Sequence, residues 1–356
     1  MARKYNVLID LDRLKDPYNG LGQVAINLGN ALSKLDDENI RFTFLVPEKF
    51  VGSFGDRVNY EKISLKRRLT PWLFPEVDLW YTIHQDSWYF PSRRSTPYIV
   101  TINDLNFLGE KAGLNRKYRL KRLQLKVNRA QVITTISRFT EGEVRKNLNT
   151  TAKDIRVIYC GVKVNTFEDT GKPPFVPDGD ILFSVGVIQP KKNFGVLIDF
   201  IKALPEHYVL VIAGNKHGEH SIELESQIRS KGLEKRIVLP GLISDEDKYW
   251  LYMNCKAVVF PSRLEGMGFP PVEAMRCGKP VFASTFSSIP EVSEDKAYYW
   301  ENFDPQYMAG LFLENIKYYE RDPDRPELLR QHSMRYTWEH AAEQYLGLFK
   351  EVLRVG

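Results

Sequence analysis

The stretch AVVFPSRLEGMGFPPVEAMRCG, residues 257–278, contains one strand, one loop and one helix start. Its first four residues are apolar, as in a strand that is buried on both faces of a parallel sheet. Two glycines, Gly266 and Gly268, then favour a sharp turn. Pro270 and Pro271 follow, and proline is tolerated best in the first turn of a helix. The stretch therefore predicts a buried strand that continues through a glycine-rich loop into the amino terminus of a helix.

The same alternation of strand and helix continues along the chain, which is typical of parallel sheets covered by helices. Strands are expected near residues 5–10, 41–46, 79–83, 98–102, 131–135 and 155–159, and again near 181–185, 208–212, 237–239, 257–260 and 281–283. The length of 356 residues suits two cores rather than one. We therefore predict an α/β fold with two doubly wound, Rossmann-like domains that face each other across a cleft.

The expected domain boundary lies in residues 165–180, which are rich in proline, glycine and charge and have no helical or strand period. The amino-terminal domain then covers residues 1–168 and the carboxyl-terminal domain residues 176–337. Residues 338–356 carry apolar side chains at helical spacing and predict a long amphipathic helix. Ligands of such folds bind at the carboxyl ends of the strands, so the cleft is the expected site.

The composition is that of a globular protein, with 43% hydrophobic and 27% charged residues. Membrane-spanning segments need about 18 or more apolar residues in a row, and no such run is present. The first residues also lack the apolar region of a signal peptide, which predicts a cytoplasmic protein. Cys160, Cys255 and Cys277 form no CxxC pair, so we expect buried free thiols rather than disulfides or a zinc site.

Basic residues are concentrated in the first half of the chain. Residues 1–165 contain 28 Lys and Arg against 17 Asp and Glu, whereas the remainder contains 22 against 28. The excess lies in residues 66–68, 93–94 and 116–129, and it favours an anionic partner, with a solvated helix face as the alternative.

The kind of anionic partner is indicated by the neighbouring aromatic residues. Aromatic side chains and one leucine, at residues 72–74 and 88–90, favour peripheral contact with an anionic membrane, at its inner face, or with a lipid-diphosphate acceptor. Nucleic-acid binding is less consistent with the sequence, because it has no stacking platform, helix-turn-helix or zinc spacing.

The glycine-rich loop quoted first has the chemistry of a binding site. The backbone amides of Met267, Gly268 and Phe269 are expected to be unpaired at a helix start, where they bind anions and hydroxyl groups. Glu265 and Glu273 stand eight residues apart, one in the loop and one in the helix, so they reach different parts of a ligand. A nucleoside-diphosphate sugar offers both phosphates and hydroxyls. On spacing alone, glutamates that merely interact with the helix dipole remain the alternative.

A second candidate, SVGVIQPKKN at residues 184–193, follows the first strand of the second half. Gly186 lies at the strand end, and Lys191 and Lys192 lie at the strand-to-helix junction where ligands bind. A lysine at this position would stabilise a departing diphosphate electrostatically. The alternative is a pair of solvated surface charges.

Over nearly its whole length the chain resembles the family 4 retaining glycosyltransferases of the GT-B fold. EGMGFPPVEAMRCGKPV at residues 265–281 is similar to the family signature EGFGLPxxEAMAxGxPV. PKKN at 190–193 resembles PRKN, and GLGQ, which contains Gly20 and Gly22, resembles the acceptor-side turn GIGR. IYCGV at 158–162 and SSIPEV at 287–292 also match family segments.

The resemblance implies a role for each matching residue. Lys192, with Lys191, would contact the donor diphosphate; Glu265 would contact the transferred hexose, and Glu273 the ribose hydroxyls. The amides of residues 267–269 would bind sugar or phosphate. The final helix would cross back to the first domain.

The resemblance also implies that no metal or other cofactor is needed, because cationic side chains and helix termini neutralise the leaving group. Asp10 and Asp12 form a DxD sequence, which elsewhere binds metal. The family has an aspartate at this edge of the sheet without a metal, so we predict no metal site.

Two positions depart from the family pattern. Many relatives have TIHDL where this chain has TINDL at residues 101–105, so Asn103 replaces a histidine expected beside the donor sugar. An amide can orient a hydroxyl but cannot carry a proton as imidazole does. His84, after the preceding strand, is a candidate substitute. Val187 stands where some relatives have a phosphate-binding arginine, which leaves more of this role to the two lysines.

The predicted function is therefore retaining transfer of a hexose to a saccharide or lipid-linked acceptor in cell-surface polysaccharide synthesis. GDP-mannose is the first candidate donor, because the PRKN subgroup resembles bacterial surface-polysaccharide mannosyltransferases, and a UDP-sugar is the second. A nucleotide-sugar epimerase or a phosphorylase on the same fold would share the phosphate site, but an epimerase needs no acceptor.

Overall fold

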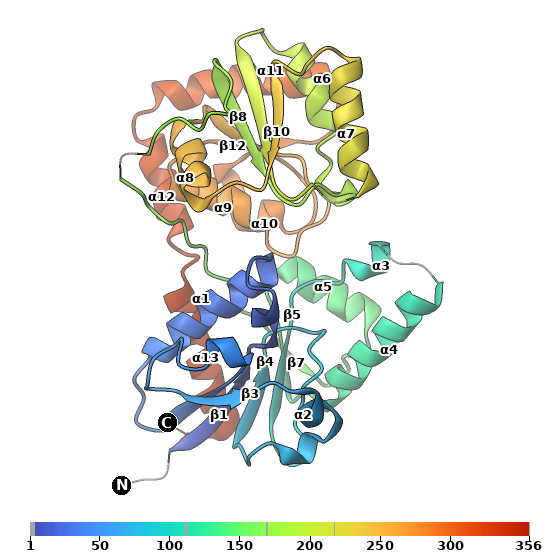
Figure 1. Cartoon of the computed structure of the whole chain (residues 1–356), viewed down its shortest axis with the longest axis vertical. Coiled ribbons are helices and arrows are strands. Elements are labelled where there is room, and N and C mark those ends of the chain that lie inside the picture. Colours follow the sequence, from blue (N-terminus) through green and yellow to red (C-terminus); the bar gives the residue numbers. More distant parts are fainter. Residues whose placement is uncertain (1–3, 111–112, 169, 217, 356) are drawn as a thin grey trace. The chain divides into compact units, whose positions relative to one another are not determined.

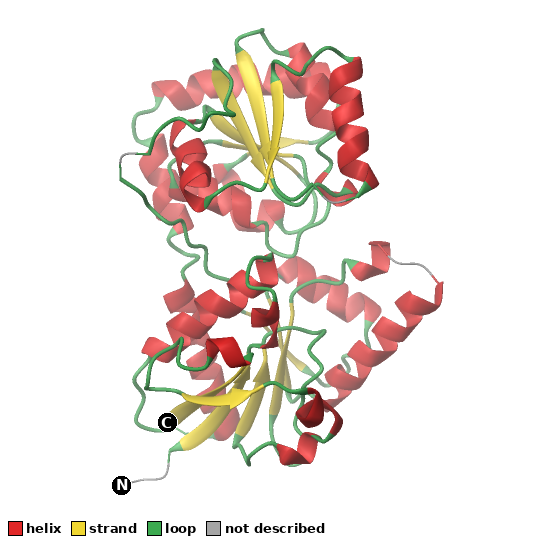
Figure 2. Ribbon diagram, viewed as in Figure 1, coloured by secondary structure: helices red, strands yellow, loops and turns green. Residues whose placement is uncertain are grey.

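The computed structural model describes residues 4–110, 113–168, 170–216 and 218–355 (Figure 1). The ends of the expected domains at residues 1–3 and 356, and residue 169 of the expected linker, lie outside this part. The chain divides into two compact units, one formed by Met1–Gly161 with Tyr336–Gly356 and the other by Val162–Arg335. Each unit consists of a sheet with helices packed on it (Figure 2).

The first unit contains a seven-stranded sheet in the order β3-β2-β1-β4-β5-β6-β7, with every pair of neighbours parallel. Its strands are β1 Tyr5–Asp10, β2 Ile40–Val46, β3 Asn59–Lys62, β4 Leu79–Thr82, β5 Tyr98–Ile102, β6 Val132–Thr135 and β7 Asp154–Val157. Its helices are η1 Asp12–Lys15, α1 Gly20–Lys34, η2 Glu48–Phe50, α2 Leu65–Leu69, η3 Pro71–Leu73, α3 Phe107–Glu110, α4 Gly113–Arg129, α5 Arg138–Asn147 and α13 Trp338–Leu353.

The second unit contains a six-stranded sheet in the order β10-β9-β8-β11-β12-β13, again parallel throughout. Its strands are β8 Asp180–Val185, β9 Tyr208–Ala213, β10 Ile237–Gly241, β11 Ala257–Phe260, β12 Val281–Ser284 and β13 Tyr298–Trp300. Its helices are η4 Pro190–Lys192, α6 Val196–Ala203, α7 Glu219–Ser230, α8 Asp245–Asn254, α9 Phe269–Arg276, α10 Ile289–Ser293, η5 Glu294–Lys296, α11 Pro305–Arg321 and α12 Arg325–Ser333.

The prediction of two Rossmann-like parallel sheets is confirmed. The sequence did not predict the edge strands β3 and β13. β3 is NYEK and only partly buried, so it has no apolar run, and β13 has three residues. These strands form because the neighbouring strand offers a free row of backbone hydrogen-bonding groups.

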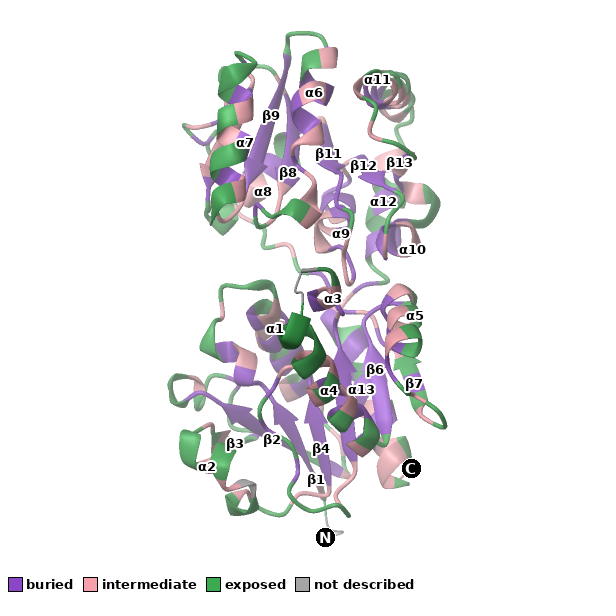
Figure 3. Cartoon of the chain, turned by 90° about the vertical axis from the view of Figure 1, so that its right-hand side faces the viewer, coloured by how far each residue is buried: buried purple, intermediate pink, exposed green. Residues whose placement is uncertain are grey.

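The central strands are buried on both faces, as their purple colour shows in Figure 3. β9 illustrates the alternation expected of a strand. Leu210 and Ile212 pack with residues of α6, α7 and α11 such as Leu197, whereas Val209 and Val211 pack with residues of α8, α9 and α12. Helices on both faces thus remove almost all apolar strand surface from water. The three cysteines are free and buried, as predicted.

Helix α13 belongs to the first unit, although it ends the chain. The rings of Tyr345 and Phe349 both pack against the ring of Tyr81, at centroid distances of 4.7 and 5.4 Å. Near the end of the helix, Lys350 Nζ lies 2.5 Å from the Asp37 carboxylate and Glu351 pairs with Arg156 at 2.8 Å. The chain therefore returns to the first unit after completing the second.

The boundary between the units lies at residues 161 and 162, before the segment 165–180 that we expected to be a linker. Val176 is buried in the core of the second unit, and Val164 and Phe175 pack against that core. This anchoring could not be read from the sequence, because these apolar residues are scattered among prolines and charged residues without a period. No helix in the described part of the chain is long and apolar enough to cross a bilayer.

The close approach of Gly161 to α13 gives a test of this boundary. A Cβ on Gly161 would lie 2.2 Å from the backbone nitrogen of Trp338, so we expect Gly161→Ala to lower the free energy of unfolding by about 1–3 kcal/mol or more. Gly142 in α5 has no atom within 4 Å of such a Cβ, so Gly142→Ala is expected to stabilise by about 0.5–1 kcal/mol. Urea unfolding of both variants measures the effect, and equal stabilities would contradict this packing.

Candidate functional site

The loop between β11 and α9 is held by serines at the end of β12 and in the segment that follows β12. Glu265 N donates to Ser287 Oγ at 3.0 Å, and Ser288 Oγ donates to the Glu265 carbonyl at 3.1 Å. Ser284 Oγ donates to the carbonyl of Ser262. The loop is therefore preorganised.

The loop ends at Gly268, which precedes α9 with a φ of +81° in the left-handed region that favours glycine. Pro270 and Pro271 lie in the first turn of α9, as predicted, and the Met267 side chain is buried. Residues 267–269 thus lead directly into a helix amino terminus. Unpaired amides at such a terminus favour negative charge, although the helix has only eight residues.

Lys192 and Glu265 meet at the carboxyl edge of the second sheet. Lys192 Nζ donates to Glu265 Oε1 at 2.6 Å, and Ser262 Oγ donates to the same oxygen at 2.6 Å. The two charged side chains are only 12% and 13% exposed. Gly186, after β8, leaves space for this lysine, because a Cβ there would lie 3.0 Å from Lys192 Cε. Three of the predicted residues, from separate parts of the sequence, therefore form one cluster.

Lys191 contributes to the cluster through its backbone. Its carbonyl accepts from the backbone nitrogen of Arg263 at 2.8 Å and from Ser262 Oγ at 3.2 Å. These bonds join the segment after β8 to the loop after β11. They fix the position from which Lys192 reaches Glu265.

Glu273 lies on α9 and is held by α8. Its Oε2 accepts from the Tyr252 hydroxyl at 2.6 Å, and its Oε1 accepts from Lys248 Nζ at 2.9 Å. Burial, and then the charge of Glu273, raise the pKa of Tyr252 well above its ordinary value, so the phenol stays a donor. Sequence reasoning missed Tyr252 and Lys248, because no motif connects α8 with α9.

In the first unit, Gly20 and Gly22 begin α1 and have different surroundings. Asn19 Oδ1 accepts from the backbone nitrogen of Gly22 at 2.7 Å and caps the helix. A Cβ on Gly22 would lie 2.0 Å from the Asp16 carbonyl oxygen, whereas one on Gly20 would meet nothing within 4 Å. Gly22 is required by the turn, and Gly20 borders open space.

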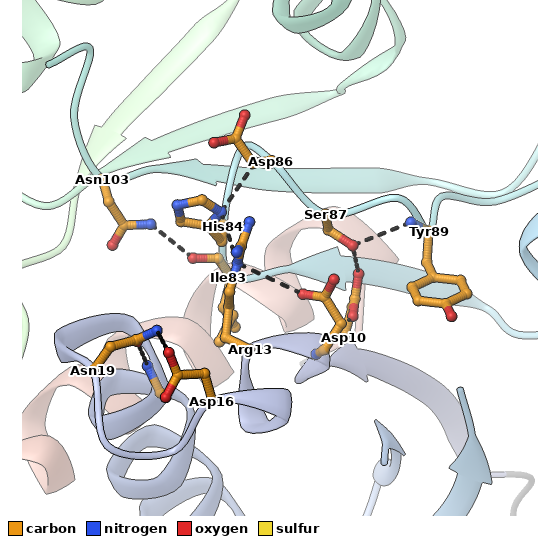
Figure 4. Close-up of polar contacts among 12 residues, drawn as sticks. Asp10, Arg13, Asp16, Asn19, Ile83, His84, Asp86, Ser87, Tyr89 and Asn103 are labelled. Carbon is orange, nitrogen blue, oxygen red and sulfur yellow. Dashed lines mark hydrogen bonds and ion pairs between the residues drawn. The ribbon is translucent and has the colours of Figure 1, made fainter. Parts of the chain in front are cut away.

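Asn103 follows β5, and its side chain is buried and hydrogen-bonded to the protein (Figure 4). Its Nδ2 donates to the Ile83 carbonyl at 2.9 Å, and its backbone nitrogen donates to Gln85 Oε1 at 3.0 Å. The sequence suggested the Asn103 amide as a contact for a sugar hydroxyl. In the structure this amide instead holds the loop after β4.

That loop contains His84, whose side chain is 3% exposed. Its Nδ1 accepts from Arg13 Nε at 3.1 Å and from the backbone nitrogen of Asp86 at 3.0 Å (Figure 4). Burial holds the pKa of His84 well below 6.5, and the nearby charges of Arg13 and Lys126 act in the same direction. The ring is therefore neutral at physiological pH.

Asp10, the last residue of β1, is fully buried at the same carboxyl edge of the first sheet. Ser87 Oγ donates to Asp10 Oδ2, and the backbone nitrogen of Asp12 donates to Oδ1 at 3.1 Å (Figure 4). Burial and then the charge of Asp12 raise the pKa of Asp10 to about 8. Lys126 Nζ donates to the Ser87 carbonyl at 2.5 Å, and burial lowers its pKa to about 8.

Asp10 and Asp12 together form the DxD sequence. Asp12 Oδ1 is fully buried without a hydrogen bond, 4.0 Å from Arg13 Nε. Among the residues that the structure describes, no three His, Cys, Asp or Glu side chains are placed to hold a metal ion. No motif connected Ser87 or Lys126 with Asp10, because they come from a loop and a helix far along the chain. Lys126 belongs to the basic segment 116–129 expected to face an anionic partner or solvent, but its side chain is buried.

The raised pKa of Asp10 predicts how stability depends on pH. Between about 3.8 and about 8 the folded protein keeps a proton that the unfolded chain releases, so this carboxyl's stabilising contribution is lost as the pH rises through that window. Asp10→Asn removes the dependence. We expect the stability of the variant relative to the native protein to increase by up to about 1.4 kcal/mol per pH unit.

Urea unfolding between about pH 5 and pH 8 measures this difference. Asp36→Asn, at an exposed position, serves as the control and should show no such trend. A constant difference between Asp10→Asn and the native protein across the window would show that Asp10 ionises normally.

The chain matches two models of glycosyltransferase families. Residues 18–166 match the family model described as "Glycosyltransferase Family 4", and residues 165–333 match the one described as "Glycosyl transferases group 1". The two matches together span both units.

Among curated relatives, the O-antigen chain mannosyltransferase B of Escherichia coli is 23% identical over 97% of this chain and 99% of that protein. The serotype-specific mannosyltransferase WbdA of Escherichia coli is 37% identical, but over 33% of this chain and only 15% of that protein. The chain therefore matches only a small part of the length of WbdA.

Two solved structures share the fold. The sucrose-phosphate synthase of Thermosynechococcus elongatus superimposes with a TM-score of 0.74 at 17% identity, covering 99% of this chain and 100% of that one. Anabaena Alr3699/HepE in complex with UDP-glucose has a TM-score of 0.72 at 17% identity, over 98% of this chain and 100% of that one.

Proposed function

The chain belongs to the two-domain glycosyltransferases whose family models match its two halves, and from this premise we propose that it moves mannose from GDP-mannose, with retention of configuration, to a saccharide or lipid-diphosphate-linked acceptor. Relatives named O-antigen chain mannosyltransferases support mannose and a cell-surface polysaccharide. A UDP-sugar is the alternative donor, because a structural neighbour was solved with UDP-glucose.

The observation that carries the donor assignment is the cluster of Lys192, Glu265 and Ser262 beside the start of α9. Lys192 supplies a positive charge with little access to water, where electrostatic stabilisation of a departing diphosphate is strongest. Lys191 and the amides of residues 267–269 add donors for phosphate or sugar oxygens.

We assign the two glutamates to the binding of ligand hydroxyl groups rather than to proton transfer. Glu265 accepts hydrogen bonds from Lys192 and Ser262, and Glu273 accepts them from Tyr252 and Lys248, so both carboxylates are held in fixed positions. We therefore assign neither carboxylate as a general base. The acceptor hydroxyl therefore passes its proton to the departing phosphate, through an oxocarbenium-like transition state, and the cationic side chains take the place of a metal ion.

Replacing the lysine tests the leaving-group role. We expect Lys192→Ala to lower kcat for mannose transfer by about 100- to 1,000-fold, because one preorganised electrostatic contact is lost. Transfer from GDP-mannose to mannobiose measures it, and product NMR reports the anomeric configuration. Lys256→Ala, which breaks a surface ion pair with Glu320, should leave kcat unchanged. Near-normal turnover of Lys192→Ala would rule out the assignment.

We propose that the first unit contacts an anionic membrane through an exposed surface on α2 and η3. Leu65, Leu69 and Trp72 are 68%, 68% and 69% exposed, with Lys66 and Arg68 among them. Arg68 also lies over the Trp88 ring, 3.7 Å from its centroid. Exposed apolar side chains interleaved with basic ones are typical of helices that bind the membrane interface. Of the basic triplet predicted from the sequence, Arg67 instead pairs with Glu61.

Vesicle binding tests this surface. Lys66→Ala with Arg68→Ala should weaken binding to phosphatidylglycerol vesicles by roughly 30-fold, since each basic residue near the surface contributes about 1 kcal/mol. Trp72→Ser should weaken it as well. Leu242→Ser removes a comparably exposed residue, at 77%, from the second unit and serves as the control. Unchanged binding of the double variant would exclude this surface.

A further inference from the structure

The loop after β4 presents a histidine at the carboxyl edge of the first sheet. β4 lies between β1 and β5 in the sheet order, so the loop is flanked by the segments that carry Asp10 and Asn103. Asn103 Nδ2 donates to the Ile83 carbonyl, and the Asn103 backbone nitrogen donates to Gln85 Oε1, so Asn103 is bonded to the residues on either side of His84. His84 is therefore held in place by its neighbours in the sheet.

The hydrogen bonds of Nδ1 determine which nitrogen of His84 carries the proton. Arg13 Nε and the backbone nitrogen of Asp86 both donate to Nδ1, at 3.1 and 3.0 Å. Both partners are obligatory donors, so Nδ1 must be the acceptor. A neutral imidazole with Nδ1 as acceptor carries its hydrogen on Nε2. The structure thus fixes the Nε2–H tautomer.

Burial keeps the His84 ring neutral, and the charged groups around it act in the same direction. Arg13 approaches from η1, and Lys126, Arg119 and Arg122 approach from α4. Asp86 forms an ion pair with Arg119, which limits its effect on the ring. A further positive charge on the imidazole is therefore strongly disfavoured. His84 serves as a fixed hydrogen-bond donor and not as a proton carrier.

The Nε2–H group is available to a ligand. In the part of the chain that the structure describes, no protein atom accepts from Nε2, which lies on the side of the ring away from Arg13 (Figure 4). Nε2 is also not among the fully buried polar atoms without a partner in those residues. The small exposed part of His84 therefore includes this nitrogen. A donor in an otherwise buried ring is costly unless something accepts from it.

We infer that His84 forms a hydroxyl-binding site for the saccharide acceptor, with Nε2–H as the donor to one acceptor hydroxyl oxygen. The inference rests on the proposed function, and it assigns the acceptor because the groups suited to the donor diphosphate, Lys192 and the start of α9, lie in the second unit. Asn103 then acts as a positioning residue, because its amide holds the loop that carries His84.

Two substitutions separate the roles of the two ring nitrogens. Glutamine places an amide nitrogen near the position of Nε2, whereas asparagine places its polar atoms near Nδ1 and has no donor at the position of Nε2. We expect His84→Asn to raise KM for mannobiose by about three- to tenfold, the effect of one net hydrogen bond, with little change in KM for GDP-mannose. His84→Gln should restore most of the loss. His207→Gln, at an exposed histidine of the second unit, is the matched control.

Nitrogen-15 NMR of the histidine rings tests the site without any turnover. The native full-length protein should show His84 as the Nε2–H tautomer throughout the neutral pH range, and mannobiose should shift that resonance, which is assigned by its absence from His84→Gln. A charged ring, the Nδ1–H tautomer, or an unmoved resonance would overturn the inference. So would an unchanged KM for mannobiose in His84→Asn.

The same measurements distinguish a failure of the proposed transfer reaction from a failure of the saccharide site at His84. A native protein that transfers no sugar but still shows the mannobiose-dependent shift would contradict the proposed transfer reaction and leave a saccharide site at His84. If the native protein transfers mannose, and His84→Asn has the same KM for mannobiose and the same pH profile, only the saccharide site at His84 is contradicted. An ionisation step in the pH dependence of the native enzyme's transfer rate that is absent from His84→Gln would show that His84 carries a proton instead.

Discussion

Burial of both faces of each sheet is the constraint on which the rest of the structure depends. Helices cover the two faces, so alternate residues of strands such as β9 enter different apolar layers, where a polar side chain without a hydrogen-bond partner is costly. The loops at the carboxyl ends of the strands escape this constraint. The polar groups of both units gather there for that reason, including Lys192 and Glu265 in the second unit and Asp10 and His84 in the first.

The two units meet the cost of partly buried charge in different ways. In the second unit, Lys192 and Glu273 each have an opposite charge within hydrogen-bond distance, so both of these charges are compensated. In the first unit, the Asp10 carboxyl is desolvated and lies beside Asp12, which favours its neutral form. His84 is likewise kept neutral by burial and, second, by the surrounding cations. The second unit thus suits an anionic leaving group and the first suits hydroxyl groups.

Positional rigidity follows from hydrogen bonds that join different elements. Ser287 and Ser288, between β12 and α10, hold Glu265 in its loop, and Asn103, directly after β5, holds the loop of His84. Groups held in this way need little reorganisation when a ligand binds, which is the main source of electrostatic stabilisation in enzymes. The residues that hold them matter as much as the residues that touch the ligand.

The sequence by itself determined the strand and helix pattern, the two parallel sheets and the residues of the loop at 265–273, because apolar periods and glycine and proline positions are local properties. It also indicated Lys192. It could not show that Lys192 meets Glu265, that Glu273 is bound by Tyr252, or that Asn103 serves the loop of His84. Nor did it reveal β3, β13 or the anchoring of Val176. Those features depend on which segments become neighbours once the sheets are assembled. Only the tertiary structure decides this, because contacts between residues far apart in the chain leave no period or spacing in the sequence.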